Sequence, residues 1–242
     1  MLETPQAPWL PIGRRGLFKL GGVAGLGLAL TQLGALQALA ASNETVADII
    51  DIAATAEALA VTLTGAVIAG ASKYDNGKGL SAMLVTWVKA IQAEEQAHYQ
   101  YLTAAGAKAL TLTFTVPQNL ADITTDSQAL LKFVVAAETV FIGAYTAAAQ
   151  EFSDLGQPAL SKVALQIASV ESQHRVLANY GAGAMPPNNV GFESAPYASV
   201  GDAAGVLKNL GLLGASNPAA TLSYSSFAGS VDFNGVSNIK PS

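Results

Sequence analysis

The sequence contains no cysteine among its 242 residues. This absence excludes a disulfide framework, a thiolate zinc site, a cysteine nucleophile and an iron–sulfur or rubredoxin-type electron-transfer module. Charged residues are also scarce, at 12% of the chain, and the formal net charge is -5. A chain this acidic has no basic patch for nucleic acid, so we exclude that class of partner.

The residues that are plentiful are small and apolar. Hydrophobic residues make up 51% of the chain and aromatic residues only 7%. Alanine is the best helix former and lets helices approach one another closely, so an alanine-rich apolar chain favours packed helices. The sequence therefore has ample material for a helical core and little for a heavily solvated surface.

The first forty residues are typical of an export signal peptide. Arg14 and Arg15 stand before an apolar, glycine-rich run, and Ala38-Leu39-Ala40 closes that run with the small-residue pattern that signal peptidase cleaves. The paired arginines resemble a twin-arginine signal, which predicts export to the periplasm or beyond and cleavage after Ala40. Two alternatives stay open. The segment could be an ordinary secretory signal, or an uncleaved membrane anchor, because a run of about 20 apolar residues can span a bilayer.

The remaining sequence predicts an all-α fold. Residues 41–181 read as a four-helix bundle, and residues 182–242, rich in Gly, Pro, Ser and Asn, read as an irregular extension with a short helix near 199–213. Two helical hairpins joined by one long crossover at 107–124 make up the bundle. Residues 111–116 of that crossover alternate in polarity, so we expect extended chain there. The four helices are expected at 44–71, 80–105, 126–153 and 158–180.

Each expected helix carries one glutamate in an otherwise apolar seam, and two helices add a histidine three residues later. The i, i+3 spacing puts each Glu–His pair on one face of its helix. Buried carboxylates without partners are costly and repel one another, whereas two divalent cations would neutralise four of them. Carboxylate and imidazole together suit iron or manganese, and iron is favoured. The predicted metal ligands are Glu57, Glu95, His98, Glu138, Glu171 and His174.

Three neighbouring side chains are given other roles. Glu94 also precedes His98, but Glu95 is preferred because the position that matches Glu94 in the second hairpin is Val170. Glu94 is therefore expected to be solvated or to support a ligand from behind. Tyr101 and Tyr145 lie near the seams and are expected to pack in the core. The sequence identifies no catalytic residue beyond the metal ligands.

The pattern Glu57, Glu95-Gln96-Ala97-His98, Glu138, Glu171-Ser172-Gln173-His174 resembles the ferritin-like di-metal carboxylate proteins, over residues 44–181. The signal, the alanine-rich helices and the long tail are most similar to exported ferritin-like proteins grouped with desiccation-related proteins. The resemblance implies a ferritin-like four-helix bundle with a pair of iron or manganese ions. It has departures, because the chain cannot hold the cysteine-bound iron of rubrerythrins. The helices are also poor in acids outside the ligands, so iron storage in a cage is not expected.

Three functions remain open from the sequence. The first is a di-metal oxidoreductase that uses dioxygen or peroxide, either to oxidise ferrous iron or, with manganese, to disproportionate peroxide without an outside electron donor. The second is a non-catalytic binding or desiccation- and stress-protection protein braced by its metals. The third is a membrane-anchored structural protein, which requires an uncleaved signal. The oligomeric state is also open, a homo-oligomer included.

Overall fold

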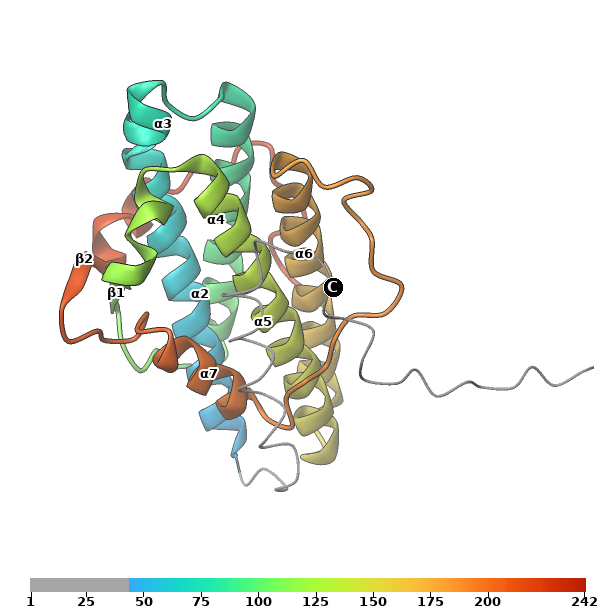
Figure 1. The fold of residues 1–242 in the computed structure, drawn as a ribbon. Coiled ribbons are helices and arrows are strands. Elements are labelled where there is room, and N and C mark those ends of the chain that lie inside the picture. Colours follow the sequence, from blue (N-terminus) through green and yellow to red (C-terminus); the bar gives the residue numbers. More distant parts are fainter. Residues whose placement is uncertain (1–43) are drawn as a thin grey trace, which may run out of the picture.

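The computed structural model of the protein describes residues 44–242, and the expected signal at residues 1–40 lies outside that range. Four long helices run side by side and form the expected all-α bundle (Figure 1). Each begins and ends within two residues of the predicted bound. They are α2 (Val46–Ala69), α4 (Ala82–Ala104), α5 (Ser127–Asp154) and α6 (Pro158–Gly181).

Side chains at the helix starts explain where these helices begin. Thr45 and Asp48 form a reciprocal capping box at α2, and the Ser81 hydroxyl accepts from the Leu84 N–H at α4. Asp126 caps α5 in the same way, and Pro158 occupies the first turn of α6, where no N–H partner is needed. The chain thus satisfies the free N–H groups of its helices locally.

The two hairpins differ in how they turn. Between α2 and α4, the short helix α3 (Tyr74–Gly77) contains Asp75 and Asn76 at φ 52° and 60°, a left-handed conformation that suits these residue types. Between α5 and α6 the chain needs only residues 155–157. Helices pack closely within each hairpin and more loosely between the hairpins, so space is left along the junction of the two.

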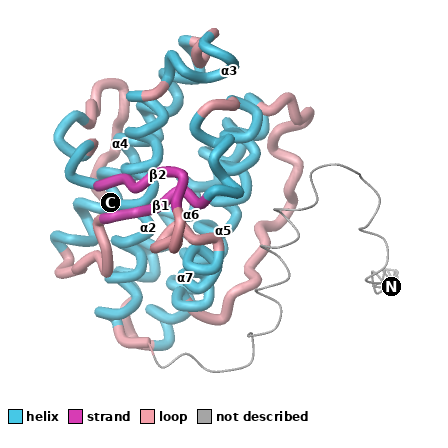
Figure 2. The backbone as a smooth tube through the Cα atoms, turned by 60° about the vertical axis from the view of Figure 1, so that its left-hand side comes forward, coloured by secondary structure: helices cyan, strands magenta, loops and turns pink. Residues whose placement is uncertain are grey.

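The crossover is partly different from the prediction. It contains the expected extended chain as β1 (Thr113–Pro117), and a 3-10 helix, Gln118–Thr124, follows beyond the residues expected to be extended. Strand β1 pairs antiparallel with β2 (Pro218–Ser223), with Thr113 opposite Ser223 (Figure 2). The prediction of an irregular tail was wrong at β2, because a strand with little pattern of its own is stabilised there by a partner about a hundred residues away.

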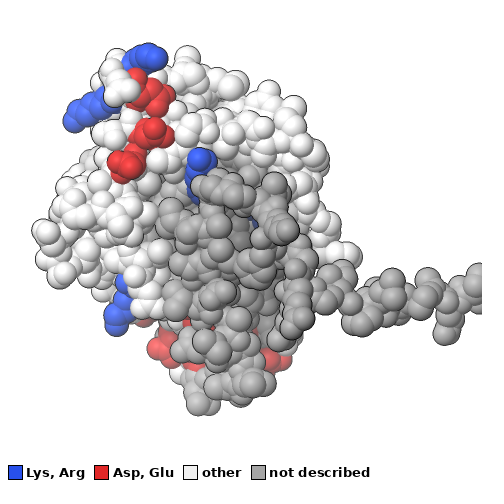
Figure 3. All heavy atoms as spheres, in the orientation of Figure 1, with Lys and Arg blue, Asp and Glu red and all other residues white. Residues whose placement is uncertain are grey.

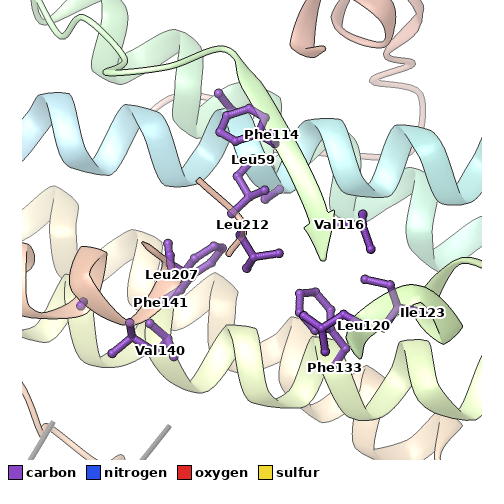
Figure 4. Close-up of a cluster of buried hydrophobic side chains, with 14 of the residues drawn as sticks. Leu59, Phe114, Val116, Leu120, Ile123, Phe133, Val140, Phe141, Leu207 and Leu212 are labelled. Carbon is purple, nitrogen blue, oxygen red and sulfur yellow. The ribbon is translucent and has the colours of Figure 1, made fainter. Parts of the chain in front are cut away.

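The C-terminal segment completes the core. Helix α7 (Val200–Asn209) is capped by Ser199 and ends four residues before the predicted bound, at a turn where Gly211 has φ 77°. Leu207 and Leu212 point inward beside Phe141 of α5, and Phe114 of β1 packs on α2 (Figure 4). The tail and the crossover therefore cover one side of the bundle.

The described surface carries few charges. On the face in view, most described atoms belong to uncharged residues, and acids and bases gather near the two ends of the molecule (Figure 3). Helices α2 and α5 are long and apolar enough to cross a membrane by length and composition alone. Here they pack inside the bundle, and the burial of at least half of each apolar window accounts for their apolar character.

Candidate metal centre

The six residues singled out from the sequence meet in the interior of the bundle. One comes from α2, two from α4, one from α5 and two from α6, because each helix turns its apolar seam, with the polar residues in it, to the centre. Five of the side chains are buried, and His98 is the most accessible, with 13% of its side chain exposed. The structure thus brings together every residue of the predicted set.

The cluster divides into two overlapping groups. Glu57, Glu95, His98 and Glu171 offer four atoms that all lie within 4.8 Å of one another, and so do Glu95, Glu138, Glu171 and His174. Glu95 and Glu171 belong to both groups. Two four-residue groups that share two carboxylates could hold a pair of adjacent cations.

Many polar atoms in this cluster have no hydrogen-bond partner. The unpartnered atoms are Glu57 Oε2, both carboxylate oxygens of Glu95, Glu138 Oε2, Glu171 Oε1 and His98 Nδ1. A buried carboxylate oxygen without a donor costs several kcal/mol, and native interiors contain few such atoms. Because they face one another within a few ångströms, the orphaned atoms fit bound cations.

Both histidines turn the same ring nitrogen to the carboxylates. His98 Nδ1 lies 3.4 Å from Glu57 and 3.4 Å from Glu171, and His174 Nδ1 lies 3.0 Å from Glu171 and 3.3 Å from Glu95. The two rings come from different helices, His98 from α4 and His174 from α6. A lone pair on Nδ1 is therefore available to each of the two groups.

Electrostatics divides the four glutamates into two pairs. Burial, together with repulsion from Glu95, raises the pKa of Glu57 to about 8, and burial beside Glu171 raises the pKa of Glu138 well above its usual value. Burial pushes the pKa of Glu95 and Glu171 in the same direction, but the two adjacent histidines outweigh burial and lower the pKa of both. Without a cation, the cluster is thus short of positive charge.

The histidines respond to the same deficit. Burial disfavours the imidazolium, but the surrounding carboxylates stabilise it more strongly. The pKa of both His98 and His174 is therefore raised well above its usual value. In the metal-free protein, protons on the two rings therefore take the place of part of the missing positive charge. A divalent cation would displace those protons and free Nδ1 as a ligand.

Two further residues contact the cluster. About a third of the Glu94 side chain is exposed, and its Oε2 lies 2.8 Å from His174 Nε2. Glu94 therefore orients the His174 ring from the side away from the cluster, which is one of the two roles expected for it. Tyr145 packs in the core as expected, and its buried hydroxyl also donates to Glu57 Oε1, a contact that the sequence did not predict. Tyr145 follows Glu138 by seven residues, two turns along the same face of α5, a spacing that could have identified it. Tyr101 packs against the core as expected.

This geometry defines a class: a four-helix bundle with a buried cluster of carboxylates and histidines that could hold metal ions. A profile of the ferritin-like domain family matches residues 45–184, the whole bundle and the turn that follows it. The chain therefore belongs to the ferritin-like domain family. Neither the curated proteins nor the solved structures give a match to this chain.

Proposed function

We propose that the six clustered residues bind two divalent metal ions, with iron favoured over manganese. The observation that carries this proposal is the set of orphaned, buried ligand atoms in two groups, each within 4.8 Å. Four carboxylates would balance the charge of two divalent ions, and the two imidazoles would complete the donor set. Mixed oxygen and nitrogen donors of this kind suit iron and manganese better than calcium or magnesium.

The chain's own residues have definite tasks in such a site. Glu94 would accept a hydrogen bond from the Nε2–H of His174, which fixes the tautomer with a free lone pair on Nδ1. Tyr145 donates to one oxygen of Glu57 and so orients the other toward the cluster. When bound, the ions would supply redox chemistry and a template for a small oxidant. The apolar helices around them exclude water from that chemistry.

We propose that the reaction is oxidation by dioxygen or peroxide, with ferrous iron as the electron source. A two-manganese form that disproportionates peroxide is the variant that needs no outside donor, which suits a chain without cysteine. Metal analysis of the natively produced protein should come first. Dioxygen uptake with ferrous iron and peroxide breakdown should then be measured.

A matched pair of variants on α5 makes this test specific. Glu138 belongs to the cluster, whereas Glu151, equally buried on the same helix, instead accepts from the Val200 N–H. Glu138→Gln should lower turnover more than tenfold, since loss of even an outer partner costs about 10–100-fold. Glu151→Gln should keep turnover near that of the unmodified protein. Equal activity in the two variants would refute a role for the cluster.

The enclosure of the cluster favours one alternative. All six side chains are buried or nearly so, as expected of a site whose metals only brace the helices in an extracytoplasmic binding or stress-protection protein. A bracing site is closed, whereas a catalytic site keeps a position open to substrate. Metal-loaded protein that turns over neither ferrous iron nor peroxide would favour this alternative.

We also propose that the protein is exported, by the twin-arginine pathway, to the periplasm or beyond. The support is the sequence of residues 1–40, and the metal site suits a pathway that carries folded proteins. Sequencing the N-terminus of protein from the exported fraction should find cleavage after Ala40. An intact Met1 in the membrane fraction would instead favour the anchored form.

A further inference from the structure

An apolar cavity lies in the junction between the two hairpins. Its volume is about 70 Å³. On α4 the lining runs from Leu84 to Glu95, and on α5 from Leu130 to Phe141. Each range covers eleven steps along a helix, or about 16 Å at the α-helical rise. The cavity is therefore elongated along the bundle, from the beginning of α4 and α5 toward its middle.

The inner end of this cavity reaches the carboxylate cluster. Glu95 and Glu138 line it, and both are buried and have carboxylate oxygens without hydrogen-bond partners. At the outer end, Leu84 and Trp87 line it while being partly exposed, and the Trp87 ring meets Tyr180 of α6 edge-on at 5.9 Å. The cavity thus connects the surface near α4 and α6 with the proposed metal site.

Apart from the two glutamates, the lining is almost wholly apolar. The other polar groups of the lining are the Trp87 indole N–H and the Thr64 hydroxyl, which donates to the Ala60 carbonyl. Aliphatic and aromatic side chains make the rest, among them Leu59, Phe133 and Leu212 (Figure 4). Away from the glutamates such a cavity stays dry, because a water there needs two to four polar partners.

We propose that this cavity binds dioxygen and is its route to Glu95 and Glu138. An apolar cavity of about 150 Å³ accepts benzene or xenon, so one of about half that volume suits a diatomic gas and not a ring. Dioxygen is apolar and loses no hydrogen bonds on leaving water. The role of dioxygen as the oxidant rests on the proposed function. Its binding in the cavity is independent of that function.

The same lining selects against hydrogen peroxide. Peroxide has two O–H donors, and moving one hydroxyl into an apolar site without a partner costs roughly 2–7 kcal/mol. Between the surface and the glutamates only Thr64 and Trp87 offer polar atoms, and the Thr64 O–H is already donated to the Ala60 carbonyl. The cavity therefore favours dioxygen over peroxide among the oxidants considered above.

The test uses metal-free protein and dioxygen itself. Dissolved dioxygen is paramagnetic and speeds the NMR relaxation of methyl protons that it contacts. Val88 and Leu131 line the cavity and are about as buried as Ile50 and Ile167, which belong to a separate core cluster. Under oxygen pressure the first two should relax severalfold faster than the second two. Equal enhancement in both pairs would overturn the proposal.

Neighbouring alanines of α5 provide a matched control. Ala137 lines the cavity and Ala136 does not, so Ala137→Leu should remove the excess relaxation and Ala136→Leu should keep it. If Ala137→Leu does not fold, Ala60→Leu, which fills the same cavity from α2, replaces it. Excess relaxation that survives the filling of the cavity would place the gas elsewhere and contradict the proposal.

Kinetics of the iron-loaded protein separate this proposal from the proposed function. In the assay, two ferrous ions give one electron each to dioxygen, which takes up two protons and leaves as hydrogen peroxide. Ala137→Leu should slow this oxidation severalfold but leave oxidation by added peroxide unchanged. Equal rates with dioxygen in Ala137→Leu and Ala136→Leu would contradict the route. Gas binding without any oxidation would leave the cavity site standing and refute the proposed function.

Discussion

Replacing Glu57 by glutamine should stabilise the metal-free protein and destabilise the metal-loaded one. Glu57 has a pKa raised from 4.5 to about 8 by burial and by Glu95. Between these two values the folded chain keeps a proton that the unfolded chain releases, so the free energy of unfolding falls as pH rises through this window. At about 1.4 kcal/mol per pH unit, the loss is complete above pH 8 and amounts to about 5 kcal/mol.

Glutamine has nearly the shape of glutamate, cannot ionise and can still accept from Tyr145. Glu57→Gln in chelated protein should therefore raise the free energy of unfolding by several kcal/mol at pH 8 and change it little below pH 4.5. With metal bound, the same substitution removes an anionic ligand and should lower stability. Urea denaturation of chelated and loaded protein at both pH values measures all four differences. A gain of the same size at both pH values, or no reversal on adding metal, would refute the reasoning.

Three other changes test the surroundings of the site. Glu94→Ala should weaken metal binding about 10–100-fold by releasing the His174 ring, and metal titration would show it, with Thr86→Ala, exposed on the same helix, as the control. Tyr145→Phe should cost the metal-free protein about 1–3 kcal/mol in urea denaturation, because Glu57 Oε1 loses its donor; an unchanged midpoint would show that this hydrogen bond is absent. Chelation should lower the melting temperature at neutral pH, because bound metal stabilises the fold by about 4 kcal/mol when free metal exceeds its dissociation constant a thousandfold. The difference in melting temperature should shrink in acid, where protons replace metal. An unchanged melting temperature after confirmed metal removal would contradict the buried-ligand account.

The sequence predicted the bundle and the positions of the cluster because both depend on helical periodicity. A glutamate that steps in phase with apolar residues, such as Glu95 among Val88, Ile91 and Leu102, must face the interior if its helix packs at all. The i, i+3 spacing then places His98 beside it without any knowledge of the partner helices. These inferences are local to one helix, and the structure confirms them.

Contacts between elements distant in sequence could not be inferred in the same way. The Tyr145 hydroxyl meets Glu57 across 88 residues, and Glu94 meets His174 across 80, so both depend on how α2, α4, α5 and α6 are rotated against one another. The β1–β2 pairing depends likewise on a tail whose sequence has no strong strand pattern. The cavity, too, arises from the looser packing between hairpins, which periodicity does not report.

The most direct test of the central claim is the metal content of the protein and of its two histidine variants. Natively produced protein, freed of loosely bound ions, should contain two iron or manganese ions per chain, one for each group of ligands. His98→Ala and His174→Ala should each contain fewer, because each removes a donor from one group only. A native protein without bound metal, or two ions per chain in either variant, would contradict the assignment of these residues as ligands.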